Sequence, residues 1–409
     1  MTFDDTAEEA AFRAEARAWL DANARRKSGD FASRGRTVGI SSTAMLAEAK
    51  AWQKKKVEAG YVQITWPTSY GCRAGRAIEQ VIFDSEEAAY DVPIGFFKIT
   101  VGMCLPTLLA YASDEQKQRY IRPGLAGEEV WCQMFSEPAA GSDLAALRMR
   151  AVPDGDHWIL NGQKIWTSGA HFADYGIVLT RTNPEAPKHR GLTMFFVDMR
   201  TPGIEHRPIR QIEGSSTFNE VFFNDVRISD AQRLGEVDEG WKVALTTLMN
   251  ERVATGGATT YPEFDELYDL CATLTLDGRP ALECEDVRDH LADWYVSEQG
   301  MRFTRYRIIS AISRGEQPGP ESAIGKLVSA RRQQEIAAFA LELMGAQGLV
   351  TDEALAPMGG AFQKSFFWTC GQRIAGGTDE ILRNIIAERV LGLPPEPRLD
   401  KAPRTEIGA

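Results

Sequence analysis

The spacing of hydrophobic residues divides the chain into three parts, and the first part is helical. Phe12, Ala16 and Leu20 recur every four residues with charged residues between them, which is typical of an amphipathic helix. The same period predicts further helices over three stretches, 43–59, 76–91 and 99–121. We therefore expect an N-terminal helical domain over residues 1–126.

The pattern changes near residue 128 to short apolar runs that are rich in β-forming residues. These runs predict strands at four places, 129–137, 175–181, 192–198 and 219–227. Pro153–Asp156 is dense in turn residues, and Asn161-Gly162 inside Trp158–Trp166 indicates a hairpin that this dipeptide closes. We expect an antiparallel β-domain over residues 127–235.

The helical period returns at Gly240 and continues to about residue 391. Pro318-Gly319-Pro320 separates two of these helices, and Pro394-Pro395 ends the last one. Residues 236–393 are therefore predicted to form a helical bundle, followed by a disordered tail over 394–409. The predicted fold class is α+β with several domains.

The length and charge of the chain exclude several classes of protein. A length of 409 residues exceeds a single hydrophobic core, so two or three domains are expected. The net charge of -11 argues against a nucleic-acid partner, because phosphate-binding proteins are usually basic. No run approaches the roughly 18 apolar residues that span a bilayer, and the acidic N-terminus lacks an apolar signal region. We expect no membrane span and a cytoplasmic protein.

The motifs of the commonest metal and cofactor sites do not occur in the sequence. The six cysteines are scattered and form no Cys-x-x-Cys pair, so neither a zinc site nor a disulfide framework is indicated. There is no Gly-x-Gly-x-x-Gly after a strand and no P-loop. A metal, a Rossmann dinucleotide site and a nucleotide phosphate loop are therefore not expected.

The segment Ser136–Asp143 carries the strongest candidate chemistry. It combines small residues with Gly141 and two hydroxyl side chains, Ser136 and Ser142. Small residues let the backbone approach a planar ring or a phosphate, whose oxygens free N–H groups can then bind. Taken alone, the segment is more typical of an ordinary polar loop after a strand.

Three segments in order resemble the acyl-CoA dehydrogenase family. Met134–Leu144 resembles the first signature of the family, Asn161–Ala170 its second flavin segment, and Ile374–Asn384 its C-terminal motif. The resemblance runs from about residue 3 to about residue 393. It implies an N-terminal helical domain, a middle antiparallel β-domain and a C-terminal four-helix bundle, with FAD as the cofactor and an acyl-CoA as the substrate.

The resemblance also implies roles for individual residues. Contacts with FAD are implied for Phe135, Ser136, Gly141, Ser142, Trp166, Thr167, Ser168, Thr378 and Glu380. Contacts with the acyl-CoA are implied for Ser142, Asn250, Arg252, Gly377 and Arg383. Trp166 would pack on the isoalloxazine and Ser168 would bond near N5. Without the flanking motif, Trp166 would more simply be a buried aromatic anchor.

The family removes the α-proton of a thioester with a glutamate, which stands at one of two positions. The first lies directly before the Gly-Thr of the C-terminal motif, where this chain has Gly376. The second lies on the first helix of the C-terminal domain, before an arginine, where this chain has Glu251 and Arg252. We therefore expect Glu251 to be the base, with the Gly376 N–H stabilising the enolate-like oxygen. The alternative is a surface glutamate in an ordinary ion pair.

Two family features that contact FAD across a subunit boundary are missing. An Arg-x-x-Phe segment is expected about 25 residues after the base, but Leu274–Pro280 lacks it. A glutamine expected before the Gly-Gly-x-Gly segment is Glu342 here. By the resemblance we expect a homotetramer or an α2β2 heterotetramer, with an electron-transfer flavoprotein or a similar electron acceptor.

Several functions are compatible with this sequence. The first is an acyl-CoA dehydrogenase that acts on a branched, bulky or ring-bearing acyl group. The alternatives are an acyl-CoA oxidase or, less favoured, a flavin-dependent monooxygenase on the same fold, and a noncatalytic partner subunit of a heteromeric dehydrogenase. The visible spectrum of the isolated chain separates the partner subunit from the enzymes.

Overall fold

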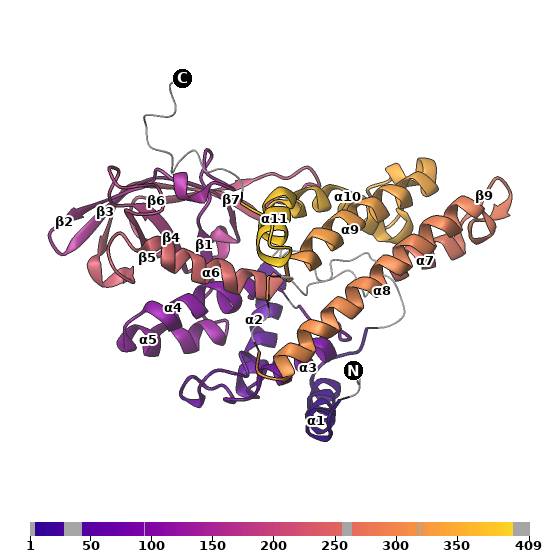
Figure 1. Cartoon of the computed structure of the whole chain (residues 1–409), viewed down its shortest axis with the longest axis horizontal. Coiled ribbons are helices and arrows are strands. Elements are labelled where there is room, and N and C mark those ends of the chain that lie inside the picture. The colour runs from indigo at the N-terminus through magenta and orange to yellow at the C-terminus, as the bar shows by residue number, and fades with distance from the viewer. Residues whose placement is uncertain are drawn as a thin grey trace.

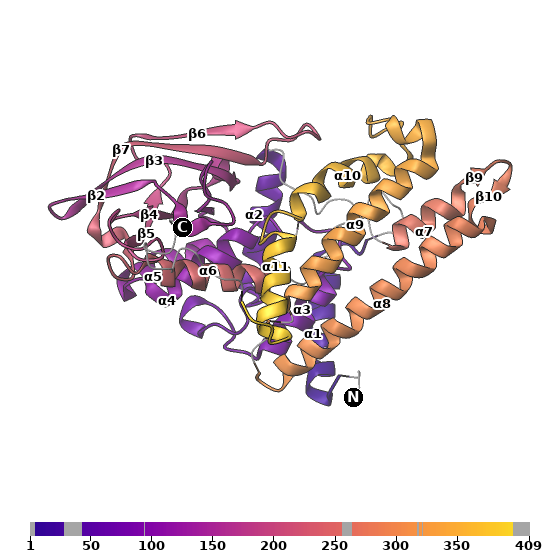
Figure 2. The same ribbon diagram turned by 45° about the horizontal axis from the view of Figure 1, so that its top comes forward.

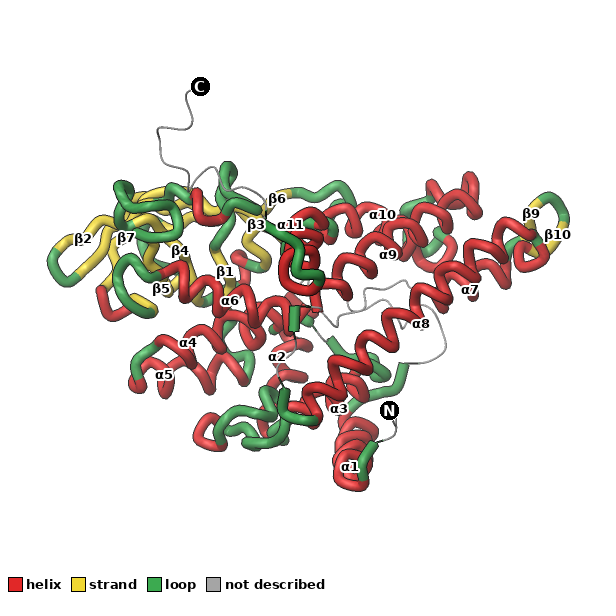
Figure 3. The backbone as a smooth tube through the Cα atoms, viewed as in Figure 1, coloured by secondary structure: helices red, strands yellow, loops and turns green. Residues whose placement is uncertain are grey.

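The three parts predicted from the sequence occur in the predicted order. The computed structural model of the chain describes residues 5–27, 43–93, 95–255, 264–316, 319–320 and 322–395. Most of the strands gather at one end of the molecule, helices occupy much of the rest, and the short strands β9 Thr275–Leu276 and β10 Arg279–Pro280 lie at the opposite end (Figure 3). The predicted α+β architecture is confirmed, whereas most of the predicted C-terminal tail lies outside the described residues.

The described residues of the N-terminal part form the α-helices α1 Ala7–Asn23, α2 Thr43–Glu58, α3 Ala77–Glu87, α4 Leu105–Tyr111 and α5 Asp114–Leu125. The single helix predicted over 99–121 is broken. A π-turn over Thr100–Cys104 precedes α4, and Ala112 leaves the helix in an extended conformation. Ser113 then caps α5, because its hydroxyl accepts a hydrogen bond from the N–H of Gln116.

The middle part is an eight-stranded sheet with the order β6-β7-β3-β2-β4-β5-β8, and β1 pairs with β4. Its strands are β1 Trp131–Met134, β2 Arg150–Asp154, β3 His157–Ser168, β4 Tyr175–Arg181, β5 Leu192–Asp198, β6 Ile204–Ile209, β7 Phe218–Ser229 and β8 Arg233–Leu234. The sheet is antiparallel as expected, except that β1 and β2 each run parallel to β4. β4 and β5 match their predicted bounds, because both are buried on both faces and form continuous apolar runs.

The hairpin predicted at Asn161-Gly162 is wrong. The turn lies earlier, between β2 and β3, where Asp154 pairs with His157. Strand β3 continues through Asn161, whose side-chain amide donates to Asp225 Oδ1 at 2.9 Å and whose Oδ1 accepts from the Asp225 N–H at 2.9 Å. This cross-strand pair keeps β3 in register with β7, and Gly162, at a φ of 145°, takes up a bulge.

The C-terminal part contains α6 Gly240–Thr255, α7 Phe264–Thr273, α8 Glu285–Ser313, α9 Ser322–Met344, α10 Ala361–Gln372 and α11 Asp379–Ile385. Helix α9 contacts α7, α8, α10 and α11, so it is the centre of this bundle. Figure 1 shows α6 beside the sheet and α11 between the sheet and α9. The turned view in Figure 2 keeps the same arrangement.

Helix α6 joins the three parts of the molecule. It contacts β5 of the sheet, α4 and the π-turn of the N-terminal part, and α9 of the bundle. Val243 and Ala244 of α6 are buried in a core cluster that also holds Leu108 and Met194. A residue near the C-terminal end of α6 is therefore placed where all three parts meet.

The described residues were compared with two expectations, the absence of a membrane-spanning helix and the absence of a metal site. Within the described ranges, none of the helices is long and apolar enough to cross a membrane. Within the same ranges, histidine, cysteine and carboxylate side chains do not gather into a group that could hold a metal ion.

Candidate active site

A buried ion pair ties the first two candidate flavin segments together. Lys164 of β3 is fully buried, and its Nζ donates to Phe135 O at 3.0 Å and to Glu137 Oε1 at 2.9 Å. The Glu137 carboxylate also accepts from the N–H groups of Arg148, at 2.7 Å, and Met149, at 2.9 Å. Burial lowers the pKa of Lys164 to about 8, and Glu137 opposes that shift. Sequence reasoning missed this pair, and its only signal was a lysine inside an apolar strand.

The loop after Glu137 borders open space. Its base is held by the Ile165 N–H, which donates to Ser136 O at 2.9 Å. Gly141 and Ser142 are exposed, and a Cβ added to Gly141 would have no atom within 4 Å. A ring or a phosphate can therefore approach this backbone closely. Phe135 differs, because it is only 5% exposed and packs into the core.

Trp166 combines an unusual backbone conformation with an exposed aromatic ring. It lies in a register shift of β3, at a φ of 60°, and its side chain is 56% exposed. A positive φ is a strained backbone for tryptophan, and such strain is common at functional sites. Its ring meets Phe218 edge to face, and Phe218 stacks on Trp368 of α10 with an interplanar angle of 2°. These rings connect the sheet with the C-terminal helices.

Two buried polar atoms near these rings lack partners among the described residues. They are the indole Nε1 of Trp368 and the Oγ1 of Thr167. Buried polar groups are nearly always hydrogen-bonded, so these two unpaired atoms are unusual, and Trp368 is linked to the exposed ring of Trp166 through Phe218. Thr167 as a whole residue is only 1% exposed, so its hydroxyl lies beneath the surface. Ser168 is half-buried.

The two base positions of the resemblance meet in space. Glu251 lies near the end of α6, and Gly376 lies between α10 and α11. A Cβ added to Gly376 would lie 3.6 Å from Oε1 of Glu251, which is ordinary van der Waals contact. The carboxylate of Glu251 therefore fills the space into which a side chain at position 376 would extend.

Two neighbours of Glu251 set its surroundings. Leu248, one turn earlier on α6, packs against a buried core cluster. Lys98 lies close enough to interact electrostatically, since burial lowers the pKa of Lys98 and the charge of Glu251 opposes that shift. No pattern in the sequence indicated Lys98.

The other two predicted residues on α6 differ from one another. Asn250 Nδ2 donates to Thr246 O of its own helix at 3.0 Å, so its amide is already engaged. The side chain of Arg252 lies outside the described part of the chain. The structure thus presents Glu251, and not Asn250, toward Gly376.

The turn between α10 and α11 carries the remaining predicted residues. Gly376 and Gly377 have φ values of 65° and 94°, which favour glycine. Among the described residues no acceptor receives the Gly376 N–H, so it is available to a ligand. Thr378 caps α11 by accepting from the Ile381 N–H at 3.3 Å, and Glu380 and Arg383 are exposed on α11.

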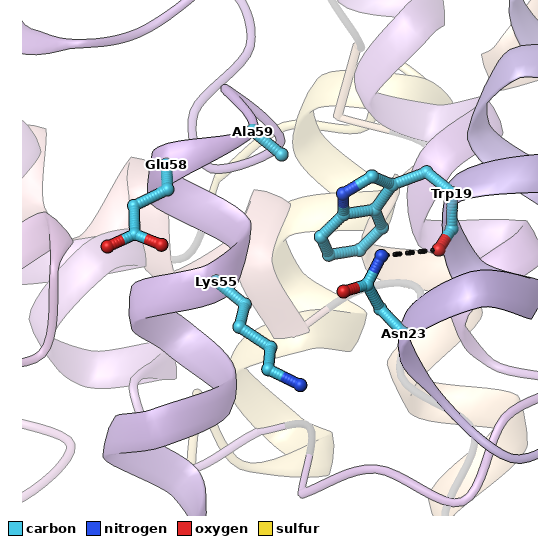
Figure 4. Close-up of a pocket in the computed structure, with 5 residues that line it drawn as sticks. All are labelled: Trp19, Asn23, Lys55, Glu58 and Ala59. Atoms are coloured by element: carbon cyan, nitrogen blue, oxygen red, sulfur yellow. Dashed lines mark hydrogen bonds between the residues drawn. The ribbon is translucent and has the colours of Figure 1, made fainter.

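Hollows in the surface of the described part coincide only partly with the predicted site. One hollow contains the predicted residues Thr378 and Glu380, and its lining is Gln334, Cys370, Arg373, Ile374, Thr378, Asp379 and Glu380. Another, between α1 and α2, contains none of the predicted residues (Figure 4). Its lining is Trp19, Asn23, Lys55, Glu58 and Ala59. Of the predicted site residues, Thr378 and Glu380 therefore line one of these two hollows, and the others that the structure describes lie outside both.

Comparison with known proteins relates all three parts of the chain to one family. Models of the acyl-CoA dehydrogenase N-terminal, middle and C-terminal domains match residues 6–128, 132–226 and 238–391. Acyl-CoA dehydrogenase FadE34 of Mycobacterium tuberculosis is 40% identical over 87% of this chain. The chain spans 48% of the length of that relative.

Two further proteins match over almost their whole length. Acyl-CoA dehydrogenase IpdE1 of M. tuberculosis is 34% identical, over 94% of this chain and 98% of its own. A solved structure described as the Tcur3481-Tcur3483 steroid ACAD superposes with a TM-score of 0.78 at 30% identity, covering 97% of this chain and all of that one. The chain therefore belongs to the acyl-CoA dehydrogenase family of FAD-dependent oxidoreductases.

Proposed function

We propose that this protein introduces an α,β double bond into an acyl-CoA thioester, with Glu251 as the base. The observation that carries the proposal is the 3.6 Å approach of Glu251 Oε1 to the Cβ position of Gly376. Positions 251 and 376 are the two alternative positions of the base in the family, and a glutamate at either one would place its carboxylate in the same region. Bound FAD supplies the acceptor for the β-hydride.

Proton removal needs a base and a hydrogen-bond donor, and we assign these roles to Glu251 and to the Gly376 N–H. The α-proton of a thioester is weakly acidic, so the developing negative charge on the carbonyl oxygen must be stabilised as the proton leaves. The Gly376 N–H, which has no acceptor among the described residues, is the donor we assign to that oxygen. Glu251 takes the proton and becomes a neutral carboxylic acid.

The residues around β3 fit the binding of FAD. Trp166 offers an exposed ring, Gly141 leaves space for close approach, and Ser142 is exposed beside it. We assign to Ser168, Thr378 and Glu380 the further cofactor contacts that the family resemblance implies. The unpaired Trp368 Nε1 marks the same region from the helical side.

The acyl group that we propose is bulky or ring-bearing. With glycine at position 376, the turn before α11 contributes only backbone at this point, and among the described residues the single side chain there is that of Glu251. The structure described as a steroid ACAD, which is 30% identical, supports this size class. We propose an electron-transfer flavoprotein as the electron acceptor, by the family resemblance alone.

The central test is anaerobic bleaching of the flavin by a panel of acyl-CoAs. The purified chain is expected to be yellow, and ring-bearing acyl-CoAs should bleach it faster than straight-chain ones of equal carbon number. A colourless chain that no acyl-CoA alters, alone or with added FAD, would instead show a noncatalytic partner subunit. One observation favours the noncatalytic partner subunit. Leu274–Pro280, where the FAD-contacting Arg-x-x-Phe segment was expected, instead contains a two-stranded hairpin.

Moving the base between its two positions tests the geometry directly. Glu251→Gly should lose flavin reduction, and adding Gly376→Glu should restore it by at least about tenfold, because general-base catalysis contributes roughly 10²–10⁴-fold. Recovery should be partial, because position 376 has a φ of 65°, which strains any residue with a Cβ. The measurement is the rate of anaerobic bleaching in stopped flow. Gly376→Gln in the same background is the control and should restore nothing.

A further inference from the structure

The turn between α10 and α11 contains two successive glycines with positive φ, and it must nevertheless hold the Gly376 N–H in place. Upstream of the glycines, the N–H groups of Ile374 and Ala375 both donate to Gly371 O. Downstream, Asp379 accepts from Arg373 at 2.7 Å, and the Asp379 N–H donates to Arg373 O at 3.2 Å. Both ends of the turn are therefore tied back to α10.

The middle of the turn is held from another helix. Lys326, near the start of α9, reaches across with its ammonium and donates to Gly377 O at 2.6 Å. The contact is partly buried, and bonds from a charged donor are stronger than neutral ones. Among the described residues, no other side chain has a hydrogen bond to Gly376 or Gly377. Lys326 is therefore the side chain that limits the freedom of this glycine pair.

We infer that Lys326 is a positioning residue that aims the Gly376 N–H at the thioester carbonyl. Without it, two glycines with broad dihedral freedom link the tied ends of the turn. A backbone that samples several conformations presents the N–H in the useful direction only part of the time. The inference rests on the proposed function, because it concerns the donor to the thioester oxygen.

Lys326→Met is the first test, with acyl-CoA as substrate and FAD bound. We expect kcat to fall by about tenfold, since ordering one residue costs an amount of free energy of that size. KM should change little, because the hydrogen bond from the Gly376 N–H acts on the reacting carbonyl of the thioester and not on the CoA moiety. Lys326→Arg keeps a cationic donor of similar reach and should recover most of kcat.

A spectroscopic measurement separates positioning from a merely structural role. The absorption of a conjugated thioester such as 3-(2-furyl)acryloyl-CoA shifts to longer wavelength when its carbonyl oxygen accepts a stronger hydrogen bond. The shift on binding should be smaller in Lys326→Met than in the natural protein and should return in Lys326→Arg. The matched control is Arg331→Met, which removes an exposed cation paired with Glu335 on the same helix and should change neither quantity.

The outcomes distinguish this inference from the proposed function. If no acyl-CoA reduces the natural protein, the proposed function is wrong. If the natural protein is reduced, and Lys326→Met shows a normal kcat and a normal shift, only the role of Lys326 is overturned. If Lys326→Met does not fold, Lys326→Gln carries the test, because its shorter side chain should also lower both quantities while keeping the polarity of the site.

Discussion

Glu251→Gln should reduce the rate of flavin bleaching by an acyl-CoA by about 10³-fold or more, within the roughly 10²–10⁴-fold range of general-base catalysis. The amide has the size of the carboxylate, so the space beside Gly376 stays filled, but it cannot accept the α-proton. FAD content should be unchanged, because the flavin residues that we propose lie on β3, on the loop after β1 and on the turn before α11. The measurement is anaerobic stopped-flow absorbance.

Glu239→Gln is the matched control for this experiment. Glu239 is an exposed glutamate directly before α6, at the opposite end of that helix from Glu251, so its replacement removes the same charge away from the proposed site. It should bleach at the natural rate. Bleaching of Glu251→Gln at the natural rate would assign the base elsewhere and leave the FAD site untouched.

Lys164→Met should remove FAD and destabilise the β-domain by about 3–5 kcal/mol, which is typical when one partner of a buried ion pair is lost. The reason is that Glu137 would remain buried and charged without its cation, with its oxygens held by the N–H groups of Arg148 and Met149. Lys164 also holds Phe135 O, so the loop that borders Gly141 would lose its support. Flavin absorbance and urea unfolding measure the two effects.

Two further variants make this second prediction specific. Adding Glu137→Gln to Lys164→Met removes the unpaired charge and keeps an acceptor for one of the two N–H groups, so part of the lost stability should return. Lys188→Met removes the exposed pair with Asp143 on the same loop, with side chains 33% and 58% exposed, and should cost about 0–1 kcal/mol. Equal losses from Lys164→Met and Lys188→Met would contradict the role given to burial.

The local sequence pattern was sufficient to predict the bounds of strands that are buried along their whole length. β4 and β5 are buried on both faces, so their sequences are continuous apolar runs, and the predicted bounds match the observed strands. Helix α6 begins at Gly240, where the helical period returns. Failures occurred where a distant residue intervenes. Asn161-Gly162 has a strong turn preference, yet the pair between Asn161 and Asp225 holds it in a strand.

The sequence alone determined the order of the three parts, the family and the identity of the residues that stand at the two base positions. These follow from short-range periodicity and from ordered motifs, which the chain carries without reference to its fold. Only the tertiary structure decided that Glu251 lies against Gly376, that Lys164 ties β3 to the segment after β1 and that Lys326 holds Gly377. Each of these contacts joins residues from separate elements, and close packing, not local preference, sets the distance between them.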